Sequence, residues 1–219
     1  MNQEIIEKTK NYVKKKLEND GSGHDWWHIY RVLQNANAIN RIEKANDYTI
    51  QLAALLHDIS DWKYSDGDEQ AGPKLAEKWL TSLQVEVKVT KQVYEIIETI
   101  SFKGMNSEKP MSTIEGKIVR DADRLDAIGA IGIARCFAFG GSRNRLMHDP
   151  NAEFKVNLTE KEYKNLDRKT NTQINHFYEK LLHLKNLMQT QTGRKIAEKR
   201  HKFMEVYLDQ FFKEWNGKS

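Results

Sequence analysis

Apolar residues recur at the spacing of an α-helix along most of this 219-residue chain. Residues three and four positions apart lie on one face of a helix, so each such stripe can pack against a neighbouring element. The segments with this spacing are residues 5–17, 27–39, 47–59, 73–83, 85–100 and 171–215. The pattern predicts an all-α fold in which roughly the first 130 residues form a compact helical core and the rest packs around it.

Three signals predict where helices begin. Asp25 is the expected N-cap of the helix over 27–39, because its side-chain oxygen can accept a hydrogen bond from an unpaired backbone amide. Ser112 and Glu115 match a capping box, which would open a further helix. The apolar run over 122–139 either continues that helix or starts the next one.

Two stretches interrupt the helical pattern. Residues 140–157 combine glycine, proline, asparagine and charge without a period, so they are predicted to form a long loop. In the C-terminal part, the helical spacing is interrupted near Thr192 and Gly193.

The composition narrows the class of protein. The net charge of +4 comes from 35 basic and 31 acidic residues that are interspersed, which argues against a nucleic-acid partner. The single cysteine, Cys136, excludes an internal disulfide, and its apolar context favours a buried small side chain over a nucleophile. No secretory signal or membrane-spanning apolar stretch is visible, so a cytoplasmic protein without a membrane partner is expected.

Three segments carry residues that suit a metal site. His24 and His28 are four positions apart, which is the spacing of metal-binding histidines on a helix, although such pairs also occur by chance. His57 and Asp58 follow the apolar run LAALL, where a histidine beside the helix C-terminus and an exposed carboxylate would be the ordinary explanation.

The third segment, RDADRLDAIGAIGIAR, places three carboxylates in an otherwise apolar helical run. Carboxylates that face a core are costly unless they are paired or bind a cation, and a network with Arg120 and Arg124 is the alternative to a metal. Taken together, His28, His57, Asp58 and Asp123 would offer a mixed nitrogen and oxygen set, which borderline and hard divalent cations accept. Such an ion leaves room for a water of lowered pKa that can attack phosphorus.

The order H…HD…D, in the contexts HIYRV, LLHDI and DADRLDAIGA, resembles the HD-domain metal-dependent phosphohydrolases. The tail segment HFYEKLLHLKNLMQTQTGRKIAEKR is similar to the YedJ/YpgQ-like branch of that superfamily, some members of which are nucleotide pyrophosphohydrolases. The resemblance implies an HD-domain helical bundle with additional C-terminal helices. It implies one domain over 1–219, with a core at about 20–140 and a C-terminal extension at about 158–216.

The resemblance also implies roles for single residues. It selects His28 over His24, because the family's first histidine precedes x-x-R-V, and it selects Asp123 from its A-D-R-L context. The implied metal ligands are His28, His57, Asp58 and Asp123. One divalent ion is expected there, Mn²⁺ first, with Mg²⁺, Co²⁺, Ni²⁺ and Fe²⁺ as alternatives.

Further residues are expected to act on the substrate. Asp61 lies three residues after the His-Asp pair, where related nucleotidases carry an acidic residue near the attacking water. It is the candidate general base, with Asp66 as the weaker alternative, and a solvent-exposed loop carboxylate is the competing explanation for Asp61. Residues expected to contact the substrate are His24, Arg31, Lys63, Lys103, His176 and Lys180. For the lysines a solvated surface position is the competing explanation, and for Arg31 a salt bridge is. One of the flanking aromatic residues Trp26, Trp27, Trp62 and Tyr64 could stack a base.

The sequence therefore predicts a hydrolase that cuts a phosphate bond in a nucleotide, with conversion of a (deoxy)nucleoside triphosphate to monophosphate and pyrophosphate as the specific hypothesis. The alternatives are a regulatory module that binds a nucleotide without turnover, and a phosphodiesterase or 5′-nucleotidase. A small phosphorylated molecule is the expected partner, and a homodimer is left open. The absence of Gly-rich phosphate loops and of C-x-x-C argues against a kinase, a dinucleotide enzyme and a structural zinc module.

Overall fold

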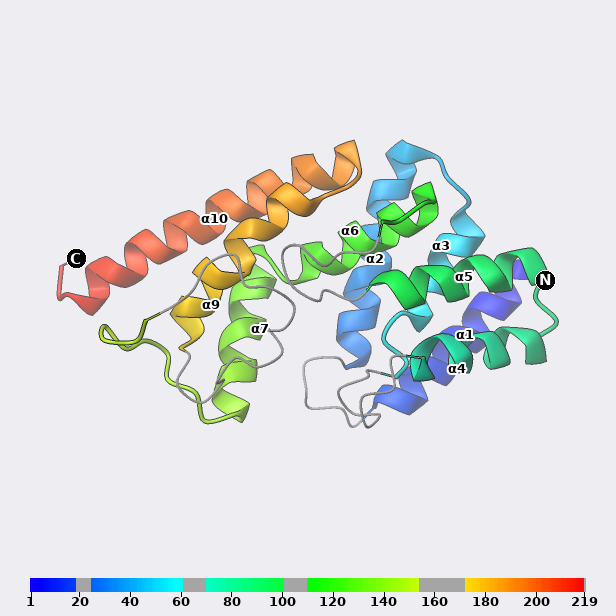
Figure 1. The fold of residues 1–219 in the computed structure, drawn as a ribbon, viewed down its shortest axis with the longest axis horizontal. Helices are drawn as coiled ribbons and strands as arrows, with labels where there is room; N and C mark the ends of the chain where they lie inside the picture. The colour runs from blue at the N-terminus through cyan, green and yellow to red at the C-terminus, as the bar shows by residue number, and fades with distance from the viewer. Residues whose placement is uncertain (19–24, 61–69, 101–109, 154–171, 219) are drawn as a thin grey trace. The chain divides into compact units, whose positions relative to one another are not determined.

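The computed structural model describes residues 1–18, 25–60, 70–100, 110–153 and 172–218 (Figure 1). Every regular element within these ranges is a helix, which confirms the predicted all-α class. Contacts divide the chain into two compact units, one holding the described residues up to Asp123 and the other those from Arg124. Each unit is described on its own, and the expectation of one domain over 1–219 stays a prediction.

The first unit is built around α3, Asp47–Leu56. This helix contacts α1 (Asn2–Leu17), α2 (Trp26–Glu43) and α5 (Val87–Ile100), and α5 in turn packs against α4 (Ala71–Ser82). The run from Leu52 to Leu56 is fully buried, because α3 has neighbours on several sides. Burial of this apolar run holds the end of α3 in place, and that end carries His57.

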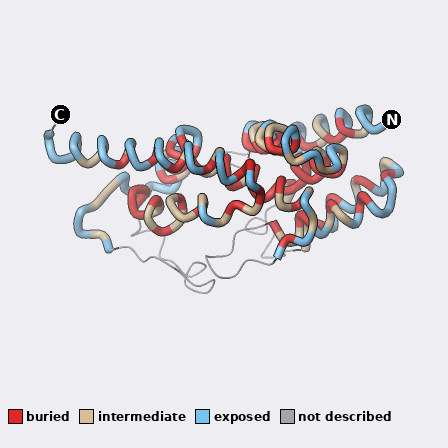
Figure 2. Tube along the Cα trace, turned by 90° about the horizontal axis from the view of Figure 1, so that it is seen from above, coloured by how far each residue is buried: buried red, intermediate tan, exposed pale blue. Residues whose placement is uncertain are grey.

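Two helix starts in this unit follow the capping rules. Asp25 is the N-cap of α2 and its side chain accepts a hydrogen bond from the His28 amide, as predicted. Asn46 caps α3 in the same way through the Thr49 amide. Figure 2 shows buried and exposed residues alternating along most of the helices, as expected from the sequence spacing, whereas α3 is buried around its whole circumference from Leu52 to Leu56.

The predicted capping box at Ser112 is wrong. The Thr113 hydroxyl accepts the hydrogen bond from the Gly116 amide at the start of α6, Ile114–Asp126. Glu115 instead accepts hydrogen bonds from the Asn46 amide and from the Gln92 side chain. The carboxylate therefore joins α6 to α3 and α5 and does not cap its own helix.

The second unit contains α7 (Gly129–Ser142), α9 (Gln173–Glu179), the 3₁₀ helix η2 (Leu181–Leu187) and α10 (Gln191–Trp215). Helix α10 packs against α7 and η2, and α9 contacts α7 and η2. The run over 122–139 is thus two helices. Gly129, at φ +76°, begins the second of them, in a conformation that a side chain would strain.

Two predicted boundaries in the second unit are shifted. Helix α7 extends to Ser142, so the irregular stretch begins at 143, and the described part of it ends at 153. The predicted break near Thr192 and Gly193 falls at 188–190 instead, between η2 and α10. Thr190 is the N-cap of α10 and accepts from the Gly193 amide, so Thr192 and Gly193 lie in its first turn.

In the described part of the chain, no single helix has both the length and the hydropathy that a membrane span needs. Helices α6 and α7 reach that composition only when taken together, and they are separated by a 64° bend.

We expect His201 to make the stability of the second unit depend on pH. It is buried in α10, and its Nε2 lies 3.2 Å from Glu205 Oε1. Burial, with Lys185 and His183 nearby, lowers the pKa of His201, although Glu205 opposes the shift. Below about pH 6.5, His201 is therefore protonated in the unfolded chain but still neutral in the folded chain. The free energy of unfolding falls as the pH drops toward the pKa of His201 in the folded state.

We expect the melting temperature to decline less steeply between pH 7.5 and 5.5 in a His201→Leu variant than in the unmodified protein. Thermal unfolding across this pH range measures the difference. An equal fall in melting temperature with pH in the two proteins would contradict the lowered pKa of His201.

Candidate metal centre

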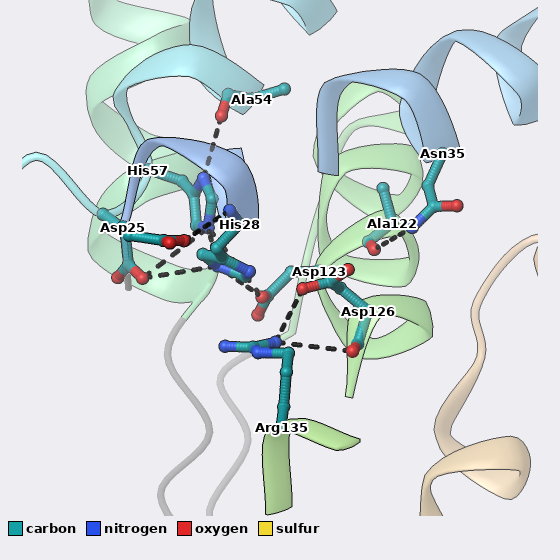
Figure 3. Close-up of polar contacts among 10 residues, drawn as sticks. Asp25, His28, Asn35, Ala54, His57, Ala122, Asp123, Asp126 and Arg135 are labelled. Carbon is teal, nitrogen blue, oxygen red and sulfur yellow. Dashed lines mark hydrogen bonds and ion pairs between the residues drawn. The ribbon is translucent and has the colours of Figure 1, made fainter. Parts of the chain in front are cut away.

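Two histidines and a carboxylate meet inside the first unit (Figure 3). The Nε2 atoms of His28 and His57 are 3.2 Å apart, although 29 positions separate the residues in sequence. Asp58 Oδ2 lies 3.5 Å from His28 Nε2 and 3.9 Å from His57 Nε2. These three groups offer donor atoms that all lie within 4.8 Å of one another.

Asp123 adds a second carboxylate from α6. It falls outside the tightest group of three, yet its Oδ1 lies 3.5 Å from His28 Nε2 and 3.8 Å from His57 Nε2. The two histidines are buried, whereas the Asp58 and Asp123 side chains keep 19% and 35% of their surface exposed. The centre is thus closed on its imidazole side and reachable on its carboxylate side.

Local hydrogen bonds fix the positions of both histidines. His28 lies in the first turn of α2, where its backbone amide is held by Asp25 Oδ1 at 2.9 Å. His57 is the C-cap of α3, and its Nδ1 lies 2.9 Å from the carbonyl of Ala54. A carbonyl only accepts, so we assign the proton to Nδ1 and a lone pair to Nε2, the nitrogen that faces His28.

The arrangement fits a divalent cation. A lone pair on His57 Nε2 that faces another imidazole nitrogen at 3.2 Å needs a proton or a cation between them. Ligands bonded at about 2.1 Å to one ion lie roughly 3.0–3.5 Å from each other, close to most of the separations seen here. Two imidazoles and two carboxylates form a mixed set that several divalent metals accept. The ligand roles of the four residues stay a proposal.

Asn35 connects the two helices that supply His28 and Asp123. It lies two turns after His28 on α2, and its side-chain amide donates to the carbonyl of Ala122 at 3.2 Å. Ala122 immediately precedes Asp123, so this bond sets where the carboxylate of α6 stands relative to α2. Nothing in the sequence marks Asn35, because an asparagine within a helix has no motif that indicates a contact 87 residues away.

Asn35→Ala should loosen the metal centre without removing any donor. We expect the affinity for a divalent ion to fall about tenfold, because partners that orient ligands typically contribute that much. Calorimetric titration of Mn²⁺ into the metal-free protein measures this, with Gln34→Ala, at the exposed adjacent position, as the matched control. Equal affinities in both variants would contradict the positioning role.

The other predicted site residues lie in different parts of the chain. Arg31 is half-buried on α2, one turn after His28, whereas His176 and Lys180 belong to the second unit, in α9 and at its C-cap. Five predicted residues lie outside the described part of the chain, and they are His24, Asp61, Lys63, Asp66 and Lys103.

Two further residues that the sequence analysis considered, Asp126 and Cys136, make contacts within the protein fold. Asp126, at the end of α6, forms an ion pair with Arg135 of α7 at 2.7 Å (Figure 3). Arg135 is not one of the two arginines, Arg120 and Arg124, that the sequence suggested as partners for the carboxylates of this segment. Cys136 is buried, and burial raises the pKa of its thiol to about 12, which keeps it protonated at neutral pH. The cysteine thus behaves as a small buried side chain, as predicted.

Comparison with known proteins identifies the family to which this chain belongs. The HD domain family matches residues 26–128, a range that contains all four candidate ligands. The chain belongs to the HD-domain family, and it is a metal-dependent phosphohydrolase. Its helical fold and its His-His-Asp cluster agree with that membership.

Within the family, the chain is similar to YpgQ of Bacillus subtilis, with 36% identity over 96% of this chain and 94% of YpgQ. A solved HD-superfamily hydrolase from Bacillus thuringiensis shares 45% identity over 99% of both chains, with a TM-score of 0.76. The structure of YpgQ in complex with ADP matches 95% of this chain and 97% of its own, at 33% identity and a TM-score of 0.74. These likenesses agree with the YpgQ-like branch that the sequence motifs indicated.

Proposed function

We propose that this phosphohydrolase acts on nucleotides, and that it cuts a (deoxy)nucleoside triphosphate to monophosphate and pyrophosphate. The observation that carries the proposal is the cluster of His28, His57, Asp58 and Asp123, which suits a divalent ion beside an accessible carboxylate edge. The ADP found with the similar protein YpgQ supports a nucleotide as the substrate class.

The four clustered residues would hold one divalent ion, for which Mn²⁺ is our first candidate. When bound, such an ion polarises a phosphoryl oxygen and makes water more acidic. The hydrogen bond from His57 to Ala54 would keep the Nε2 lone pair directed at the ion, and Asn35 would keep Asp123 in place. Arg31, one turn after His28, is the cation we propose for a non-bridging phosphate oxygen.

The remaining assignments come from the sequence. Asp61 rests on the family resemblance, and the others rest on residue type and position along the chain. Asp61 is proposed to accept a proton from the attacking water, with Asp66 as the alternative. His24, Lys63, Lys103, His176 and Lys180 are proposed to contact the phosphate chain. A cytoplasmic location and a homodimer stay predictions.

A screen of nucleoside mono-, di- and triphosphates with Mn²⁺, Mg²⁺, Co²⁺ and Ni²⁺ tests the function. We expect equal amounts of monophosphate and pyrophosphate from a triphosphate, identified by chromatography and not only by counting phosphate. Orthophosphate with nucleoside would favour a 5′-nucleotidase instead. Tight nucleotide binding with no product under any metal would favour the regulatory module.

The same assay tests the proposed base. Asp61→Asn should lower turnover while the metal content stays unchanged, because a proton acceptor is not a ligand. If Asp61→Asn is fully active and Asp66→Asn is not, the role passes to Asp66.

A further inference from the structure

Two aromatic side chains are exposed near the start of α2, the helix that carries His28. Trp27 keeps 59% and Tyr30 keeps 43% of its surface exposed, although both residues sit on a helix whose other large apolar side chains are mostly buried. Their ring centroids are 6.0 Å apart and their planes meet at 80°. An edge-on contact of this kind steadies the pair while leaving ring surface open for a third planar group.

The helix places Trp27 beside Arg31, the residue proposed to contact phosphate, and Tyr30 on the far side of Trp27 from Arg31. Trp27 immediately precedes His28, and Arg31 lies four residues after Trp27 and three after His28. Successive residues turn by about 100° around a helix, so the Arg31 position falls between those of His28 and Trp27 on the surface of α2. Buried imidazole, half-buried guanidinium and exposed indole thus follow one another around a single helix.

The patch has the size of a small ligand and not of a protein interface. The next exposed position along this face of α2 is Gln34, a polar residue, and the other exposed large hydrophobic residues described in the first unit are Met1, Ile42, Val87 and Ile114. Of these, only Ile42 belongs to α2, and it lies near the opposite end of the helix. A stable protein interface buries about 800 Å² per partner, which two neighbouring rings cannot supply.

We propose that Trp27, steadied by Tyr30, stacks the base of the nucleotide whose phosphates lie at Arg31 and the metal centre. The proposal rests on the nucleotide substrate inferred above and adds how the enzyme would hold the base. Every base has a planar face, so such a platform binds nucleotides with little choice among bases. The same platform would favour a nucleotide over an inorganic phosphate chain, because the phosphate chain has no base to stack.

Equilibrium binding of two probes separates the base from the phosphates. ADP and pyrophosphate are titrated calorimetrically, with Mn²⁺ present, into the unmodified protein and into Trp27→Ala, Trp27→Phe and Tyr30→Ala variants. We expect Trp27→Ala to weaken ADP binding roughly five- to one-hundredfold, the range that stacking on an aromatic side chain supplies. Pyrophosphate affinity should stay within about twofold, because pyrophosphate has no base to stack.

Two variants serve as controls. Trp27→Phe should restore most of the ADP affinity, since it keeps a planar ring. Trp215→Ala removes an exposed tryptophan of the second unit and should leave both affinities unchanged.

The outcomes distinguish this proposal from the function on which it rests. Unchanged ADP affinity in Trp27→Ala would overturn the platform while leaving the nucleotide substrate intact. An equal loss for ADP and pyrophosphate would also overturn it, because Trp27 would then act by supporting the fold. If the unmodified protein bound neither probe and hydrolysed no nucleotide, the proposed function would fail and the platform with it.

Discussion

Asp58→Asn should strip the protein of its divalent metal and lower phosphohydrolase turnover roughly a thousandfold. A metal that polarises a phosphoryl oxygen supplies several kcal/mol of transition-state stabilisation, and each ~1.4 kcal/mol is a tenfold change in rate. Asparagine keeps the size and shape of the side chain, but it removes the charge and replaces one acceptor oxygen with a donating NH₂ group. The Asp58 oxygen lies within 4 Å of both buried imidazole nitrogens, so little can replace that charge.

Metal content after dialysis and turnover with the best nucleotide are the two measurements. His57→Gln should behave in the same way, because the two histidines face each other across 3.2 Å. Asp209→Asn, an exposed carboxylate on α10, is the matched control and should keep both metal and activity. Full metal content together with full turnover in Asp58→Asn would remove the basis of the metal centre.

The second large effect is on stability and concerns Asp126. Its buried carboxylate accepts a hydrogen bond from Arg135 at 2.7 Å, and the side chain is only 2% exposed. Arg200 lies close to the same carboxylate and donates to the carbonyl of Leu125 at 2.6 Å. Burial lowers the pKa of the Arg200 guanidinium and the Asp126 charge works against that, so one carboxylate balances two arginines.

Asp126→Asn should therefore destabilise the protein by about 3–5 kcal/mol, because it removes the charge of a buried carboxylate that lies beside two partly buried guanidinium groups. In a chain of this length that corresponds to a fall in melting temperature of roughly 6–20 °C. Thermal and urea unfolding measure the loss. Arg135→Gln added to Asp126→Asn should recover part of it, since fewer charges then remain unpaired.

An exposed ion pair of the same length gives the control. Lys8 and Glu4 also lie 2.7 Å apart, but their side chains are 55% and 65% exposed. Glu4→Gln should change the melting temperature little, because water and salt screen such a pair. A melting temperature for Asp126→Asn within a degree of the unmodified protein would show that Arg135 and Arg200 find other partners.

Local patterns in the sequence were enough to predict much of the fold. The helix over 85–100 was assigned from its apolar stripe despite its β-branched residues, and it is α5. Asp25 was assigned as an N-cap and is one, because capping depends on residues three positions apart. The family motifs also named His28, His57, Asp58 and Asp123, although their roles as ligands await the experiments above.

Contacts between distant segments settled what local patterns left open or misjudged. Ser112 and Glu115 have the spacing of a capping box, yet Glu115 binds the start of α3 and the Gln92 side chain, because packing brings those donors within reach. The hydrogen bond from Asn35 to Ala122 and the 3.2 Å approach of His28 to His57 likewise join residues 87 and 29 positions apart. Spacing along one helix describes which face a residue occupies, whereas the neighbour that meets this face depends on how the helices within each unit pack together.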